Sequence, residues 1–124
     1  MGLLGRVEHV LTSQSISADT RSDGVDLRHA DYIVFAVTVT EAATLSVALR
    51  IEVSVDNSTW SELVGALNSY ATVTANGFYL MVPNKQQTAS SGTARSQHPY
   101  IRVLLDLATG SATVTIDAFI QDMY

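Results

Sequence analysis

The residues of this chain that are best suited to chemistry are its histidines and aspartates, and their spacing decides whether they form a site. The three histidines, His9, His29 and His98, each stand alone, with no second ligand at a metal-like spacing on a shared strand or helix face. This spacing favours surface or loop histidines, so we expect no metal site on them.

An acidic turn is the second candidate. Asp19, Asp23 and Asp26 surround Gly24, and several carboxylates around a tight turn are what calcium loops use. The segment lacks the full EF-hand spacing and the closing glutamate. Turn-forming aspartates explain the pattern more simply, and we expect neither a metal nor another cofactor.

Catalytic motifs are absent from the sequence. Serine, histidine and aspartate all occur, but there is no Gly-x-Ser-x-Gly elbow to mark a nucleophile. The chain has no cysteine, which excludes thiol catalysis, zinc fingers and disulfide scaffolds. Its seven glycines stand in separate turns or at the terminus, so no phosphate-binding loop forms. We expect no catalytic residues and no enzyme.

Length and charge restrict the partners. A chain of 124 residues fits one domain, residues 1–124. The net charge is -5 and the seven basic residues are scattered, which argues against a nucleic-acid partner. The longest apolar stretch, 32–39, is far below the roughly 20 residues of a membrane helix. We therefore expect no membrane partner. The apolar part of the N-terminus is also too short for a signal peptide.

The elements that must carry any site are strands, because the dominant hydrophobic period is two. In 32–40 and 46–55, every second side chain is apolar, and the side chains between them form a second row on the opposite face of the strand. Asp56-Asn57-Ser58 supplies turn residues before 59–63, so a hairpin is predicted there. Segment 78–82 is a further strand, stopped by Pro83.

The end of the chain predicts another hairpin. Segments 100–107 and 112–120 both alternate, and Ala-Thr-Gly-Ser at 108–111 provides the turn between them. Arg102 and Asp117 would then pair across this hairpin. Weaker strand candidates lie at 6–12, 14–18 and 25–28, and a single helical turn is conceivable at 61–66.

Together these segments predict an all-β fold. Seven or eight short strands separated by turns fit a single-domain antiparallel β-sandwich or a jelly-roll-like barrel, with almost no helix. Segment 32–40 has a second apolar row, including Val34 and Ala36, and Leu104 adds another such position. These rows exceed what one small core consumes, which favours self-association.

Two segments are candidates for partner contacts. The 15 residues of 84–98 are polar, small and aperiodic, and loops of that length are usually functional or disordered. Residues 1–5 form a possible N-terminal arm. The alternatives are an exposed flexible loop and a frayed end. The predicted contacts are Leu3, Leu4, Arg6, Lys85, Gln86 and Arg95.

Three strand phrases carry a resemblance to a known class of proteins. They are 51–63 with its Asp56-Asn57-Ser58-Thr59-Trp60 turn, 98–107 with Tyr-Ile-Arg-Val, and 112–120 with Thr-Val-Thr-Ile. These phrases resemble small β-sandwich proteins of tailed bacteriophage particles, over about the last two-thirds of the chain. The sequence departs from the pattern at Asn57-Ser58, where glycine is common, and in its polar segment 84–98.

The resemblance implies a structural virion protein of the capsid decoration or cement type. Such a protein is made in the host cytoplasm, binds the outer surface of the major capsid lattice, and stabilises the phage head, often as a homotrimer. The same phrases occur in carbohydrate-binding sandwiches and in tail, fibre and head-tail junction modules. An exposed Trp60 near Tyr79 would favour sugar binding, whereas the nearby Leu63 and Val64 favour a core position for Trp60.

Overall fold

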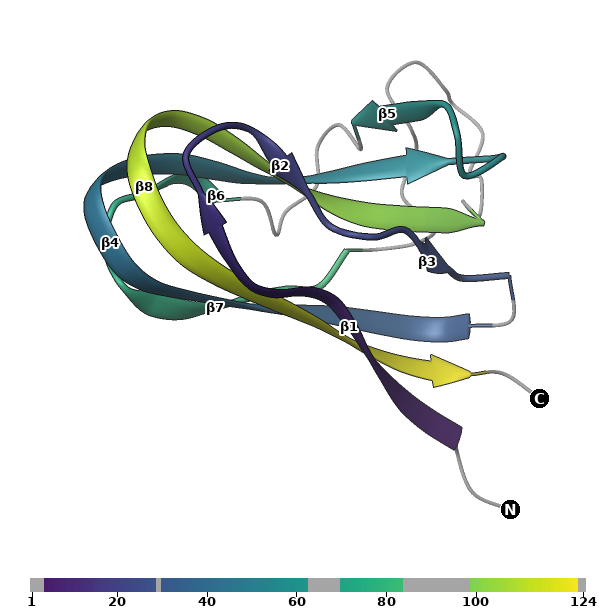
Figure 1. Ribbon diagram of the computed structural model, residues 1–124. Coiled ribbons are helices and arrows are strands. Elements are labelled where there is room, and N and C mark those ends of the chain that lie inside the picture. Colours follow the sequence, from purple (N-terminus) through teal and green to yellow (C-terminus); the bar gives the residue numbers. More distant parts are fainter. Residues whose placement is uncertain (1–3, 29, 63–69, 84–98, 123–124) are drawn as a thin grey trace.

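The computed structural model describes residues 4–28, 30–62, 70–83 and 99–122 of the chain (Figure 1). These residues form strands and turns without any helix, which confirms the all-β prediction. The eight strands belong to one antiparallel sheet. Nothing in these described segments is a helix able to cross a membrane.

The strands differ greatly in length. They are β1 (Leu4–Ile16), β2 (Thr20–Arg21), β3 (Val25–Asp26), β4 (Ala30–Ser54), β5 (Trp60–Glu62), β6 (Tyr70–Val73), β7 (Gly77–Met81) and β8 (Tyr100–Asp122). β4 and β8 pair antiparallel from Ala30 opposite Asp122 to Ser54 opposite Tyr100. These two long strands form the frame to which the short strands attach.

β4 and β8 bend together, which folds the sheet into two layers (Figure 1). The first layer contains β1, the second half of β8, the first half of β4, and β7. The second layer contains β2 and β3, the first half of β8, the second half of β4, and β5 and β6. The result is a sandwich made from a single continuous sheet.

The predicted hairpin at 108–111 is wrong, because β8 runs through these residues without reversing. Segments 100–107 and 112–120 are two halves of one strand, and each pairs with β4. Gly110 takes a φ of 86° at the bend, opposite register shifts in β4 between Thr40 and Ser46. The glycine therefore permits a bulged bend where a chain reversal was expected.

The predicted pairing of Arg102 with Asp117 is wrong for the same reason. Arg102 lies opposite Glu52 in the second layer, and its Nε is 2.8 Å from Glu52 Oε1. Asp117 lies in the first layer, where its Oδ1 is 2.7 Å from His9 Nδ1. The bend separates the two halves of β8 and gives each residue another partner.

The core fills the space between the layers. The predicted inward rows are buried: Ile33, Phe35, Val37 and Val39; Val47, Leu49, Ile51 and Val53; Ile101, Val103 and Leu105; Ala112, Val114, Ile116, Ala118 and Ile120. Alternation also placed Val55 in the inward row of 46–55, but β4 ends at Ser54 and Val55 is 75% exposed. Each fully buried aliphatic or aromatic side chain contributes about 1.5–3 kcal/mol to folding.

The predicted hairpin at 56–58 is confirmed between β4 and β5. Asp56 Oδ1 accepts the backbone N–H groups of Ser58 at 2.9 Å and of Thr59 at 2.8 Å. The carboxylate thus holds the turn closed, as an Asx turn does. The helical turn considered at 61–66 is not formed at Ser61 and Glu62, because these residues belong to β5. Its remaining residues, 63–66, lie outside the described residues.

Replacing Asp56 with alanine is expected to lower the melting temperature near neutral pH, and this loss should shrink in acid. Hydrogen bonds from Thr59 and Ser58, and from the Ser54 hydroxyl, lower the pKa of Asp56. A lowered pKa gives stability that is complete above the unfolded-state value of about 3.9 and disappears as the pH falls through the folded-state value. Thermal unfolding of the wild type and the Asp56→Ala variant, measured from neutral pH down into acid, tests the prediction. A difference in melting temperature between the two that stays constant with pH would contradict it.

Candidate functional site

The outer faces of the two layers differ in chemistry. On the second layer, charged residues of neighbouring strands pair with one another. Arg50 bridges Asp106 at 3.1 Å and Glu62 at 3.2 Å. Glu52 accepts a hydrogen bond from Arg102 at 2.8 Å and forms an ion pair with Arg21 at 3.4 Å. These charged groups form ion pairs with one another across β2, β8, β4 and β5, so this face is suited to contact with solvent.

Trp60 belongs to this charged face. It is half-buried, and the guanidinium of Arg102 lies 4.0 Å from the centre of its ring. The predicted core position is therefore wrong, since Trp60 is outside the core cluster. Tyr79 lies on β7 in the first layer, on the inward side, and packs against the core. The two rings are on different layers and form no common sugar platform.

Replacing Arg102 with methionine is expected to lower the free energy of unfolding by about 1–3 kcal/mol. The side chain of Glu52 is 12% exposed, and removing the closer of its two arginines leaves a largely buried carboxylate with one longer contact. Loss of the guanidinium also uncovers the indole ring, so urea unfolding followed by the fluorescence of Trp60, the single tryptophan, reports both effects.

The matched control is Arg28→Met. Arg28 makes a slightly shorter pair with Asp26, at 2.6 Å, but on the exposed surface. Exposed pairs contribute little to stability, so this variant should unfold like the wild type. Equal losses in both variants would show that burial of Glu52 is not the cause.

The first layer has an apolar outer face. Five large apolar side chains on it are between 44% and 63% exposed: Val7, Tyr32, Phe78, Leu80 and Phe119. Together with the half-buried Val34 they are called the apolar face here. They come from β1, β4, β7 and β8, so the face crosses the whole layer.

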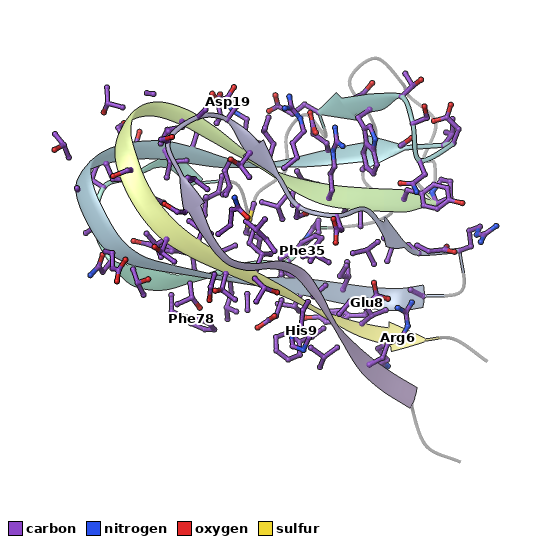
Figure 2. The ribbon with its side chains drawn as sticks, viewed as in Figure 1. Arg6, Glu8, His9, Asp19, Phe35 and Phe78 are labelled. Atoms are coloured by element: carbon purple, nitrogen blue, oxygen red, sulfur yellow. The ribbon has the colours of Figure 1, made fainter. Side chains whose placement is uncertain are left out.

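The strand register places these side chains next to one another. Phe119 lies between Val7 of β1 and Val34 of β4, so these three form one row. Phe78 and Leu80 continue the face on β7, opposite Thr38 and Ala36. Figure 2 shows Phe78 and His9 projecting outside the first layer, whereas Phe35 lies between the layers.

A hollow of about 420 Å³ opens on this face. Its lining residues are Gly5, Arg6, Val7, Tyr32, Val34, Phe119, Ile120 and Gln121. Two aromatic side chains, Tyr32 and Phe119, are among them, and Gly5 contributes no side chain to fill the space. The hollow can receive an apolar side chain of a partner.

A polar pair lies within the apolar face. His9 Nδ1 and Asp117 Oδ1 are 2.7 Å apart, in the row next to Val7 and Phe119. The imidazole is 70% exposed. No third ligand gathers there, and among the described residues no group of three or more His, Asp or Glu side chains is arranged to hold a metal ion.

The acidic turn has structural partners instead. Asp19 Oδ1 accepts the backbone N–H of Leu107 at 2.8 Å, and Asp26 binds Arg28. The backbone N–H of Asp23 donates to the carbonyl of Val10 at 2.9 Å. These contacts tie the 19–26 segment to β8 and β1, so the carboxylates of Asp19 and Asp26 have roles in the fold.

The predicted contact residues are only partly described. Leu4 begins β1. Arg6 follows on the side of β1 that faces the second layer, where it pairs with Glu8 and donates to the carbonyl of Asp26 at 3.3 Å. Leu3, Lys85, Gln86 and Arg95 lie outside the described residues, and their role stays a prediction.

The apolar face was partly visible in the sequence. The second row of 32–40 signalled Tyr32, Val34 and Ala36, and Phe119 stands out among the polar residues of its row. Val7, Phe78 and Leu80 were missed as surface residues. Alternation shows two rows on each strand, but it does not show which outer row remains uncovered.

Comparisons with known proteins give fold likenesses and no family. No protein-family model matches the chain, and no curated protein matches it. Three similar solved structures have low sequence identity. The SPBc2 prophage-derived protein YomS is 8% identical over 96% of both chains, with a TM-score of 0.49. The xylan-binding domain from CBM 22 is 16% identical over 98% of this chain and 86% of its own, with a TM-score of 0.42.

The third structure is FLHE, at 14% identity over 99% of this chain and 97% of its own, with a TM-score of 0.35. These likenesses carry no functional argument for the chain. Its class rests on its own structure, which is an all-β antiparallel domain with one charged and one apolar outer face.

Proposed function

We propose that this protein is a structural component of a phage particle, a capsid decoration protein that binds the outer surface of the major capsid lattice and stabilises the head. The observation that carries the proposal is the apolar face, because monomeric soluble proteins rarely leave a large contiguous apolar surface uncovered. The resemblance of the three strand phrases to phage β-sandwich proteins supplies the particular partner.

The contrast between the two outer faces gives the protein an orientation. The apolar face lies against the capsid, where each Å² of buried apolar surface contributes about 25 cal/mol. The charged face, with its internally paired arginines and carboxylates, points to solvent. Binding of this kind uses no reactive residue, so the proposal includes no catalysis.

Repetition of the contact over the lattice provides the stabilisation. A single small apolar contact gives modest affinity, but linked copies bind with a combined strength far above that of one copy. We therefore propose a homo-oligomer on the capsid exterior, with the trimer as the form that the resemblance favours.

Co-sedimentation with undecorated phage heads tests this function. Saturable binding at a fixed ratio to the capsid subunit is the expected result, with the mass of the free protein measured in parallel. Absence of binding to heads of the phage that encodes the protein would overturn the proposal.

One observation favours a second candidate, a carbohydrate-binding module of a phage tail or fibre. Tyr32 and Phe119 stand about half exposed beside the hollow, and aromatic rings of this kind can stack on sugars. Retention of the protein by host polysaccharide, together with failure to bind heads, would favour this candidate over decoration.

A further inference from the structure

The β1 strand forms one edge of the first layer. Among the described residues it pairs only with β8, at the end of the strand order β1-β8-β4. Its register with β8 is unbroken from Leu4 opposite Asp122 to His9 opposite Asp117. A regular edge strand presents backbone N–H and C=O groups that another strand can bind.

The regular edge is short, and its end is well defined. Register shifts follow between His9 and Leu11 and between Leu11 and Gln14, and Ser13 has a φ of 42°. The carbonyl of Val10 already accepts the backbone N–H of Asp23. Residues beyond His9 are therefore unsuited to continued pairing, and the segment 4–9 is the surface that a partner strand can use.

The side chains of this segment carry a symmetric charge pattern. Arg6 and Glu8 lie on the inward side of β1, on either side of Val7, which points outward into the apolar face. The side chains of Arg6 and Glu8 are 36% and 38% exposed, so both are partly accessible to a partner, although Arg6 also donates to the carbonyl of Asp26 on β3. They pair with each other within one chain.

This pattern is complementary to itself in one antiparallel register. When Val7 lies opposite Val7 of a second copy, each Arg6 lies opposite a Glu8, and two cross-strand ion pairs form. A shift that places Arg6 opposite Arg6, or Glu8 opposite Glu8, sets like charges against each other at the centre, which is destabilising. The charges therefore select one register out of the neighbouring ones.

We propose that the partner of this edge is a second copy of the same chain, and that two β1 strands pair antiparallel about a two-fold axis at Val7. The two first layers then form one continuous sheet, and the two Val7 side chains join the apolar faces into a single larger surface. The contact does not depend on capsid binding and is present in the free protein.

Such a contact has a defined size and stoichiometry. It is isologous, meaning that each copy contributes the same segment, so it closes at two copies and is separate from any contact that builds the trimer proposed on the capsid. A ladder of six residues with two exposed ion pairs is a small interface, so we expect a dissociation constant in the range of about 10 μM to 1 mM.

Charge exchange between Arg6 and Glu8 tests the register directly. The variants Arg6→Glu and Glu8→Arg each place like charges opposite one another, and each should be monomeric where the wild type dimerises in sedimentation equilibrium at low salt. An equimolar mixture of the two variants restores both opposite-charge pairs and should dimerise again. The double variant Arg6→Glu with Glu8→Arg should also dimerise by itself.

The mixture separates the proposal from a folding defect, because a damaged strand cannot be repaired by mixing two damaged chains. A wild type that stays monomeric up to about 1 mM would overturn the proposal. So would a mixture that remains monomeric, or single variants that associate as the wild type does. Because no capsid is present in the experiment, its result is independent of whether the protein decorates heads.

Discussion

Replacing Gly110 with alanine is expected to lower the free energy of unfolding by about 2 to 5 kcal/mol. Gly110 has a φ of 86°, in the region that side chains of L-residues rarely adopt. A Cβ atom built there would lie 2.5 Å from the carbonyl oxygen of Ala43 and would also overlap the carbonyl of Thr44. These are backbone atoms of the facing bend in β4, so no side-chain rotation can relieve the overlap.

The matched control for this variant is Gly5→Ala. A Cβ atom on Gly5 meets a single backbone atom, the carbonyl oxygen of Ile120, at an ordinary contact distance of 3.8 Å. Alanine in this strand position is expected to leave stability unchanged or slightly higher, since it reduces the freedom of the unfolded chain. Urea unfolding of the two variants measures the difference, and equal stabilities would show that the bend at Gly110 tolerates a side chain.

The same bend explains what the sequence could and could not predict about the fold. Alternation identified the inward rows of 32–40, 46–55, 100–107 and 112–120 with Val55 as the exposed exception, because burial of every second residue depends on the strand alone. Whether 108–111 reverses the chain or bends it depends on the partner strand. Ala-Thr-Gly-Ser suits a turn, and the same glycine suits a bulge, so only the pairing with β4 decides between them.

The candidate site was less predictable, because it depends on the positions of strands far apart in the chain. Val7 and Phe119 are 112 positions apart in the sequence and become neighbours only through the pairing of β1 with β8. The charged face likewise needs three strands to bring Arg21, Glu52 and Arg102 together. The surplus apolar row of 32–40 predicted that some outer face would need a partner, but its extent required the tertiary structure.

Replacing Phe119 with threonine is expected to weaken attachment to undecorated heads by about tenfold or more. Phe119 lies between Val7 and Val34 and borders the hollow, so it occupies the middle of one row of the apolar face. Threonine favours strands as phenylalanine does, but it removes the aromatic ring that a partner would cover. Co-sedimentation over a range of protein concentrations gives the change in affinity, and circular dichroism checks that the sheet is retained.

The control is Val55→Thr, which removes apolar surface at a position 75% exposed in the turn after β4, outside the apolar face. It should attach like the wild type.

Phe78→Thr then measures how far the contact extends, since Phe78 belongs to the same face but lies on β7, at the opposite edge of the layer from β1. Loss of attachment in both phenylalanine variants assigns the whole face to the capsid, and loss with Phe119 alone restricts the contact to the hollow. Attachment that none of the three substitutions changes would show that the apolar face is not the binding surface.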